Sequence, residues 1–397
     1  MKTVQELFCE FDQKRNSIEI SLEKIKSDLG RFTDGIVLYG AGSAGIAFLY
    51  VLRDIGIEPK YFADGSEAKW GGFVEGLEVI APQDIICRTG DNTLVIVTIN
   101  TDGKRYCKSF DEALRTGGHT GVHQKLLEFG CRHLIDYTFF RRCHALFDGD
   151  RYNLPSCSDV YQMSNHRGDI EKVYQMLADD LSREVFLKIL EFRMLDDSLA
   201  IPTMTQEKQY FEDDFLKKEP DEVFVDCGAF NGISLQTFLG GNDNTFQGYY
   251  GFEPDGSNFK RLEDYVAGMP EDIRKKINLI KAGVYSHDRG VNLYSLNGPG
   301  SFVADIGKEH IRTVTIDETL GGVRATYIKM NIEGSEIEAL KGAEQTICRY
   351  KPRLAVAGYH KTWDFWEIPL IIKQYRDDYK LYLRSYMNHI SFVYYAT

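Results

Sequence analysis

The first part of the chain alternates short apolar runs with amphipathic segments. Over residues 3–29, apolar positions recur at helical spacing, which predicts a helix or a helical hairpin. From residue 34 to about 140, strand-like runs such as GIVLYG and TLVIVTI alternate with helical segments such as SAGIAFLYVLRDIG. Such alternation predicts a parallel sheet with helices on both faces.

The second part begins with a different pattern. DIEKVYQMLADDLSREVFLKILEFRML is strongly helical and contains no strand-like run, so it predicts a helical connector. After residue 220 the strand-like runs return, as VFVDC, GYYGFEPD, INLIKAGVYS, TYIKMNIEG and RLAVAGYH. The last two runs, KLYLRSY and SFVYYAT, are separated only by a turn, which predicts that the sheet ends in an antiparallel strand pair.

A chain of 397 residues is too long for one typical core, so two domains are expected. We predict an α/β protein with two Rossmann-like three-layer domains. Its expected parts are an N-terminal helical segment (1–30), a Rossmann-like nucleotide-binding domain (31–145), a helical connector (146–219) and a second α/β domain (220–397).

Charge and cysteine usage narrow the class of protein. The net charge of −12 has the wrong sign for gathering phosphates, so we expect no nucleic-acid partner. The first residues lack the apolar core of a signal peptide, and the stretch GIAFLYVL is too short to span a bilayer. None of the eight cysteines forms a Cys-x-x-Cys pair. We therefore expect a cytoplasmic protein with reduced cysteines, no membrane insertion and no metal site.

The stretch VFVDCGAFNGIS carries the clearest chemical signal. A buried strand ends at Asp226, and Gly228 and Gly232 follow in a turn that leads into a helix. Glycines let a ligand approach the backbone closely, and the start of the helix offers free N–H groups to a carboxylate. The next strand ends at Glu253, where an acid can accept hydrogen bonds from both hydroxyls of a ribose, while Asp226 could face an amino group of the cofactor.

The spacing also excludes two common nucleotide motifs. No Gly-Lys-Ser/Thr follows, so the turn is not a P-loop, and it lacks the tighter Gly-x-Gly-x-x-Gly that seats a pyrophosphate. An adenosine cofactor with an amino acid in place of the second phosphate fits best. We therefore predict S-adenosylmethionine as the cofactor of the second domain.

The run DCGAFNG…FEPD…IKMNIEGSEIEALKGAE…KPRLAVAGYHKTWDFWEIP…YKLYLRSY resembles the FkbM-type S-adenosylmethionine-dependent methyltransferases. The resemblance is dense over about residues 220–397 and looser upstream. It implies a class I methyltransferase fold and O-methylation of a hydroxyl on a saccharide or polyketide-like acceptor. The positions that it implies for cofactor binding are Asp226, Gly228, Ala229, Asn231, Gly232, Glu253 and Ala282.

One position departs from the family. Asn331 stands in IKMNIEG where the family usually has aspartate, and an amide can orient a hydroxyl but cannot take its proton. The candidates for a base are then Glu333 and His360, whose imidazole has a suitable unperturbed pKa. Either side chain could instead be structural, with Glu333 capping the next helix and His360 bonding a loop.

A second glycine-rich turn lies in the first domain. Gly40, Gly42 and Gly45 follow a strand and open a helix, and Asp64 ends the next strand. The segment resembles small Rossmann-like domains attached to bacterial sugar-modifying acyltransferases and dehydratases, which implies a nucleotide or nucleotide-sugar site, or a structural module that binds nothing. NAD is a further alternative, although the chain contains no Tyr-x-x-x-Lys pair.

The leading hypothesis is an S-adenosylmethionine-dependent O-methyltransferase that acts on a saccharide, nucleotide-sugar or polyketide-like hydroxyl, free or in a glycoconjugate. Two alternatives stay open. The first is an NAD-dependent oxidoreductase that uses the turn at Gly40, and the second is a catalytically silent protein that binds a nucleotide-sugar. A homodimer is compatible with the pattern, but no feature of the sequence requires one.

Overall fold

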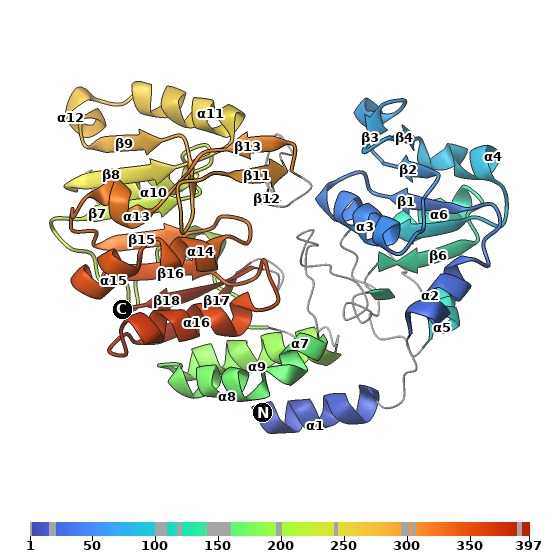
Figure 1. The fold of residues 1–397 in the computed structure, drawn as a ribbon, viewed down its shortest axis with the longest axis horizontal. Coiled ribbons are helices and arrows are strands. Elements are labelled where there is room, and N and C mark those ends of the chain that lie inside the picture. Colours follow the sequence, from blue (N-terminus) through green and yellow to red (C-terminus); the bar gives the residue numbers. More distant parts are fainter. Residues whose placement is uncertain are drawn as a thin grey trace. The chain divides into compact units, whose positions relative to one another are not determined.

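The computed structural model describes residues 2–15, 21–99, 109–116, 121–137, 139–140, 160–195, 201–241, 245–294, 302–303, 307–386 and 391–397. The chain divides into two compact α/β units (Figure 1). Unit 1 comprises Met1–Arg167 and Leu190–Ala200, and unit 2 comprises Gly168–Ile189 and Ile201–Thr397. The α/β prediction with two domains is therefore confirmed.

Unit 1 is built on a six-stranded sheet with the order β3-β4-β2-β1-β5-β6. Neighbours from β4 to β6 pair in parallel, and β3 adds an antiparallel edge. The strands are β1 (Ile36–Tyr39), β2 (Tyr61–Ala63), β3 (Phe73–Val74), β4 (Leu77–Ile80), β5 (Leu94–Val97) and β6 (His133–Asp136). The helices are α1 (Val4–Arg15), α2 (Leu22–Leu29), α3 (Ser43–Asp54), α4 (Ile85–Thr89), α5 (Phe110–Thr116), α6 (Gly121–Glu128) and α7 (Val160–Asn165), with 3₁₀ turns η1 (Glu67–Lys69) and η2 (Pro82–Asp84).

Unit 2 is built on a seven-stranded sheet with the order β17-β18-β16-β15-β7-β8-β9 (Figure 1). Its strands are β7 (Val223–Cys227), β8 (Gly248–Phe252), β9 (Ile277–Ile280), β15 (Tyr327–Met330), β16 (Arg353–Ala357), β17 (Leu381–Tyr386) and β18 (Ser391–Ala396). The strands from β16 to β9 are parallel, and β18 runs antiparallel to both of its neighbours. The predicted antiparallel pair at the end of the sheet is thus present.

Helices accompany the sheet of unit 2 along the chain. They are α8 (Arg167–Met176), α9 (Asp180–Leu195), α10 (Ile233–Gly241), α11 (Gly256–Ala267), α12 (Glu271–Arg274), α13 (Ile316–Leu320), α14 (Glu336–Lys341), α15 (Glu344–Tyr350) and α16 (Asp364–Tyr375), with the 3₁₀ turn η5 (Gln206–Lys208). The division between the units falls within α9, after Ile189. The predicted connector 146–219 thus contains α7, α8 and α9, and its positions 146–159 and 196–200 lie outside the described residues.

The structure corrects one predicted strand. INLIKAGVYS does not form one strand, because the ladder of β9 ends at Ile280 and β10 (Gly283–Val284) pairs with β14 (Thr313–Val314) in a separate two-stranded sheet. Between them in sequence, β11 (Val291–Tyr294) pairs with β12 (Phe302–Val303) and β13 (Glu309–Ile311) in a three-stranded antiparallel sheet. Two small sheets are therefore inserted between β9 and β15.

Aromatic side chains fill the core between the central strands of unit 2. The strand register places Phe224 of β7 beside Tyr327 of β15, and their rings stack with centroids 5.0 Å apart. Tyr249 of β8 meets the other side of Phe224, with ring centroids 5.5 Å apart. All three side chains are buried, so they hold β15, β7 and β8 together beneath the strand ends.

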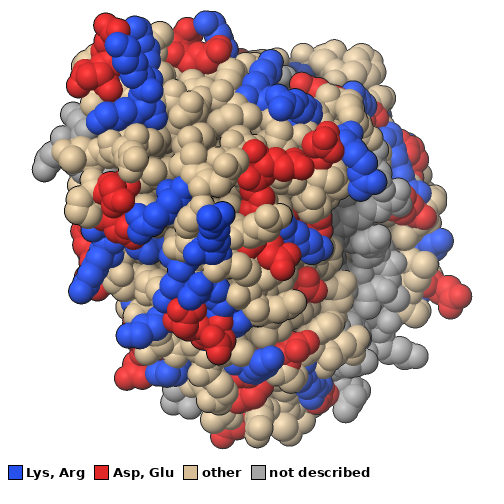
Figure 2. Space-filling view, turned by 60° about the vertical axis from the view of Figure 1, so that its left-hand side comes forward, with Lys and Arg blue, Asp and Glu red and all other residues tan. Residues whose placement is uncertain are grey.

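Surface charges of both signs are interspersed. On the face shown in Figure 2, basic and acidic side chains alternate, and the described residues form no broad area of one sign. Several charges pair within one helical turn, such as Lys260 with Asp264 at 2.8 Å and Lys275 with Glu271 at 2.6 Å. Pairs as exposed as these contribute little stability.

Gly45 provides a test of how unit 1 packs. A Cβ at this position would lie 1.9 Å from the carbonyl oxygen of Gly40, because α3 packs directly against the turn after β1. We expect Gly45→Ala to lower the free energy of unfolding by about 1–3 kcal/mol or more, the usual cost of overpacking. Gly42→Ala is the matched control, since a Cβ there meets nothing within 4 Å. Thermal unfolding that affects both variants equally would contradict this account.

Candidate cofactor and active site

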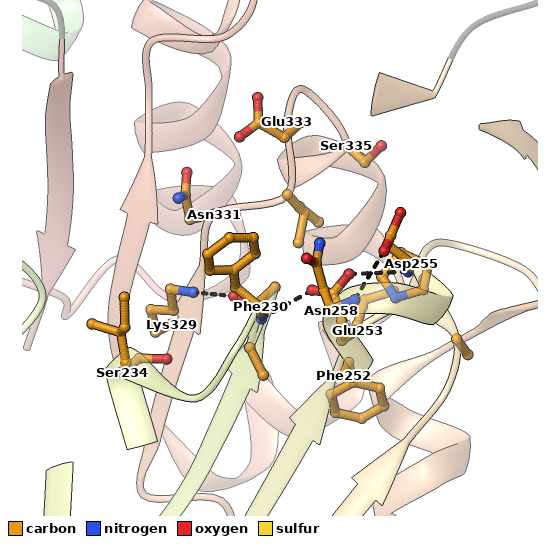
Figure 3. A pocket seen from close by; sticks show the side chains of 18 of the residues that line it. Phe230, Ser234, Phe252, Glu253, Asp255, Asn258, Lys329, Asn331, Glu333 and Ser335 are labelled. Carbon is orange, nitrogen blue, oxygen red and sulfur yellow. Dashed lines mark hydrogen bonds between the residues drawn. The ribbon is translucent and has the colours of Figure 1, made fainter. Parts of the chain in front are cut away.

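A cavity of about 540 Å³ opens at the carboxyl ends of the central strands of unit 2 (Figure 3). Its walls come from the segments that follow β7, β8, β9 and β15, joined by β11 to β13 and by residues 206–211. Parallel α/β sheets place ligands in this position, because the loops at their carboxyl ends converge there. The cavity is therefore the candidate site of unit 2.

Glu253 ties two walls of the cavity together. Its Oε2 accepts a hydrogen bond from the N–H of Phe230 at 2.9 Å, and its Oε1 accepts one from the N–H of Asp255 at 3.0 Å. The residue is 6% exposed, and burial raises the pKa of its carboxyl against these two hydrogen bonds. Each carboxylate oxygen keeps a further acceptor position, so Glu253 can still accept hydrogen bonds from a ligand.

Asp226 lies beneath the cavity and is fully buried. Its Oδ1 is 3.0 Å from Nζ of Lys329, and its Oδ2 accepts hydrogen bonds from the hydroxyls of Tyr249, at 2.8 Å, and Ser234. Lys329 also donates to the carbonyl oxygen of Gly228 at 2.8 Å. The carboxylate that the sequence analysis assigned to a cofactor amino group is thus engaged by protein groups.

Gly228 is required by packing within the protein. Its φ is 84°, and a Cβ would lie 2.1 Å from the carbonyl oxygen of Asn331. The turn after β7 therefore crosses the end of β15 at a distance that only glycine permits. This reason differs from the predicted approach of a ligand.

The seven residues that the sequence predicted for cofactor binding divide into those that line the cavity and those that do not. Gly228, Ala229, Glu253 and Ala282 line the cavity, whereas Asp226, Asn231 and Gly232 do not belong to its lining. A Cβ on Gly232 would meet the ring of Tyr265 at 2.8 Å, so this glycine also serves packing.

Asn331 and Glu333 line the cavity on the loop that follows β15 (Figure 3). The side-chain Oδ1 of Asn331 accepts a hydrogen bond from the hydroxyl of Tyr359 at 3.1 Å. Glu333 has a φ of 55°, which is unusual for a residue with a side chain. Burial raises the pKa of its carboxyl, although His360 opposes this effect. The loop thus presents one amide and one carboxylate to the cavity.

His360 lies behind this loop and is not part of the cavity lining. Its Nδ1 is 2.9 Å from Oε1 of Glu336, and its Nε2 is 3.7 Å from Oε2 of Glu333. Glu336 is a residue that the sequence analysis missed. The available signal was a second acid three positions after Glu333, in IEGSE, which reads equally well as an ordinary residue at a helix start.

Ligand-type atoms of Glu336, His360 and Asp364 lie within 4.8 Å of one another. Oε1 of Glu336 and Nδ1 of His360 are already at an ion-pair distance of 2.9 Å from each other. In unit 1, His119 lies outside the described residues, and His123 is buried with its Nε2 3.4 Å from Oδ2 of Asp136. The expectation of no metal site stays a prediction.

At the predicted nucleotide site of unit 1, the carboxylate of Asp64 is bonded to groups of the protein itself. Asp64 Oδ2 accepts hydrogen bonds from the N–H of Ala41 at 2.9 Å and from Nζ of Lys69 at 2.8 Å, while Oδ1 accepts one from the N–H of Ser66 at 2.9 Å. Gly42 is the N-cap residue of α3, so no side chain at this position caps the N–H groups at the start of the helix. Binding of a nucleotide, a nucleotide-sugar or NAD at Gly40, Gly42, Gly45 and Asp64 stays a prediction.

Residues 226–394 match the Methyltransferase FkbM domain. The match starts at Asp226 near the end of β7 and ends at Tyr394 within β18, so it includes β8, β9, β15, β16 and β17 in full and the four loops at the cavity. Unit 2 therefore carries an FkbM methyltransferase domain. No curated protein matches the chain. In the part of the chain that the structure describes, no helix is long and apolar enough to cross a membrane.

Among solved structures, the methyltransferase FkbM of Methylobacillus flagellatus KT is similar over 100% of both chains, with a TM-score of 0.66 and 20% identity. At this identity the likeness shows the fold alone. More distant are a precorrin-6y C5,15-methyltransferase from Geobacter metallireducens GS-15 (TM-score 0.29, 10% identity, 46% of this chain and 82% of that one) and a candidate methyltransferase from Streptococcus mutans in complex with SAH (0.28, 12%, 46% and 99%). With TM-scores below 0.3, these two structures say nothing about the site of unit 2.

The pair of Asp226 and Lys329 can be tested by stability. Lys329→Met leaves a fully buried carboxylate without its cation, so we expect the free energy of unfolding to fall by about 3–5 kcal/mol. The double variant Asp226→Asn with Lys329→Met removes both charges and should recover part of this loss. Urea unfolding measures both variants. A double variant that is less stable than Lys329→Met would contradict the proposed pairing.

Proposed function

We propose that unit 2 is an S-adenosylmethionine-dependent methyltransferase that transfers its methyl group to a hydroxyl. The observation that carries this proposal is Glu253, whose buried carboxylate borders the cavity and is held by the N–H of Phe230 in the turn after β7. An acid in this place, at the end of the strand beside the glycine turn, suits the two hydroxyls of a ribose.

Other residues of the cavity suit the adenine of the cofactor. Asn258 is 3% exposed, lines the cavity, and its Oδ1 has no hydrogen-bond partner. An unpaired buried amide oxygen is costly, and the amino group of an adenine would satisfy it. Ala282 and Val284 supply apolar surface in the same cavity. Together these residues fit an adenosine, with Glu253 at its ribose.

S-adenosylmethionine, when bound, supplies an activated methyl group on a sulfonium. The protein then has to orient a hydroxyl in line with that methyl group and accept its proton, and alignment alone supplies much of the rate. Asn331 can orient the hydroxyl by hydrogen bonding, and Glu333 can accept the proton when it is ionised.

The acceptor that we propose is a saccharide, nucleotide-sugar or polyketide-like molecule. Aromatic rings of Tyr210, Phe211 and Phe230 line the cavity and offer flat apolar faces. Aliphatic side chains of the small sheet add to them, namely Val291, Leu293, Val303 and Ile311. Few polar groups among apolar walls are typical of sites for small organic ligands.

Titration calorimetry with S-adenosylhomocysteine tests the cofactor. We expect one-site binding to the full-length protein, and Glu253→Ala should weaken it by about 10- to 100-fold, because hydrogen bonds to a charged group are worth about 1.5–3 kcal/mol. Glu263→Ala is the matched control, since Glu263 is exposed on α11 and does not line the cavity. Equal loss in both variants, or no binding to the wild-type protein, would overturn the proposed cofactor.

The acceptor is then sought by turnover. Wild-type protein and S-adenosylmethionine are incubated with panels of nucleotide-sugars, free saccharides and hydroxylated polyketides, and release of S-adenosylhomocysteine is measured. The proposed acceptor class requires release that depends on one of these panels. Binding of S-adenosylhomocysteine without such turnover would argue against that class and leave the cofactor assignment intact.

A further inference from the structure

The carboxyl group of Glu333 borders the cavity in surroundings that disfavour its charged form. Glu333 lines the cavity, and its side chain is 33% exposed. Burial raises the pKa of its carboxyl, which favours the neutral form that cannot accept a proton. A base in this position therefore needs a nearby positive charge to stay ionised.

His360 is placed to provide that charge. The imidazole lies between two carboxylates, with Nδ1 2.9 Å from Oε1 of Glu336 and Nε2 3.7 Å from Oε2 of Glu333. The residue is 8% exposed, so water screens these interactions weakly. Both ring nitrogens lie within ion-pair distance of a carboxylate oxygen, so an imidazolium here is attracted to Glu336 and to Glu333.

Glu336 is itself fixed and fully buried. Its Oε1 accepts a hydrogen bond from the N–H of Ile332 at 2.8 Å, and its Oε2 accepts one from the N–H of Gly334 at 2.9 Å. Both donors belong to the loop that carries Glu333. Glu336 therefore holds the imidazole on one side and shapes the Glu333 loop on the other.

Other charged groups near the imidazole come from three further elements. Asp364 opens α16, and its Oδ2 accepts a hydrogen bond from the N–H of Lys361 at 2.7 Å. Burial, and then Glu336, raise the pKa of Asp364 to about 8, so this carboxyl is mostly neutral at pH 7. Lys329 on β15 opposes, as His360 does, the rise that burial causes in the pKa of Glu333, while burial and then Glu333 raise the pKa of Tyr359 in the segment after β16. The carboxylates that favour the charged imidazole are therefore Glu336 first and Glu333 second.

We propose that Glu333 accepts the proton of the acceptor hydroxyl, and that His360, held by Glu336 as a buried imidazolium, is a positioning residue that keeps Glu333 ionised. This inference rests on the proposed function. As the bond between the acceptor oxygen and the methyl carbon forms, the bond from that carbon to sulfur breaks and its electron pair stays on S-adenosylhomocysteine. The hydroxyl proton passes to Glu333 and reaches solvent after the product leaves.

The charge of His360 agrees with this arrangement. Burial alone would lower the pKa of the imidazole, but Glu336 and Glu333 outweigh it and raise the pKa to about 9. The folded protein therefore keeps the imidazolium through neutral pH and loses it as the pH rises through about 9. Over the same pH range, the positive charge of His360 favours the ionised form of Glu333.

The test reads the imidazole directly and needs no cofactor or acceptor. Full-length protein labelled at Cε1 of its nine histidines is titrated by carbon NMR, and His360→Gln identifies the resonance of interest. We expect His360 to titrate near pH 9. Glu336→Gln should lower that midpoint by about 1–3 pH units, the range for a charge partner at this distance. Glu333→Gln should lower it by less, because its oxygen is farther away.

Glu338→Gln is the matched control. Glu338 lies on α14 with Glu336, but its carboxylate is 2.6 Å from Nζ of Lys341, so the midpoint of His360 should stay unchanged. A wild-type midpoint at or below 6.5, or an equal effect of Glu336→Gln and Glu338→Gln, would overturn the proposal. Broadening of the His360 resonance by stoichiometric Mn²⁺ would overturn it as well, since the group would then be a metal site.

Turnover adds a second reading once an acceptor is found. Glu333→Gln should lower kcat by about 10²- to 10⁴-fold, the usual contribution of a general base, while S-adenosylhomocysteine still binds. His360→Gln should move the acid limb of the pH–rate profile to higher pH, whereas a purely structural role would lower the rate at every pH. Failure of the proposed function shows as absent cofactor binding, and the NMR result stands apart from it.

Discussion

The buried ion pair between Lys329 and Asp226 is the constraint on which the site of unit 2 depends. The two residues lie side by side in the register of β15 and β7, the central strands of the sheet. Taking both charges out of water is expensive, and hydrogen bonds from Tyr249 and Ser234 to the carboxylate offset part of that cost. Because Lys329 also holds the carbonyl oxygen of Gly228, the pair fixes where both cavity loops begin.

Both units contain the same arrangement of an acid and a glycine turn, but the acid has different surroundings in each. In each, an acid at the end of the second strand accepts a hydrogen bond from a backbone N–H in the glycine turn, as Asp64 does with Ala41 and Glu253 does with Phe230. In unit 1, Lys69 then pairs with the same acid. In unit 2, both hydrogen bonds described for Glu253 come from backbone groups, and the carboxylate borders a cavity. Similar turns thus differ in what they leave available to a ligand.

Much of the fold could be predicted because apolar runs and turn residues are local signals. The sequence indicated both sheets, the final antiparallel pair and the place of Glu253. Pairing between distant segments was beyond reach, so β10 was joined to β9 although it pairs with β14. Lys329 was overlooked because a lysine within an apolar run gives no sign of its partner. For His360 the sequence suggested a role and a place at the same edge of the sheet, but it did not indicate that Glu336 of α14 lies 2.9 Å from its Nδ1.

The order of strands at one edge of the sheet of unit 2 also bears on how the unit folds. β18 lies between β16 and β17, although β17 comes first in the chain. The ladder described for β17 is with β18, and on its other edge Leu381 and Ser385 form isolated bridges to Leu177 and Thr203. In the described part of the chain, β17 therefore joins the seven-stranded ladder only through β18, which pairs with β16. Because β18 pairs with β16 across the segment that holds α16 and β17, this edge of the sheet forms through contacts between residues far apart in sequence, the kind of pairing that slows folding.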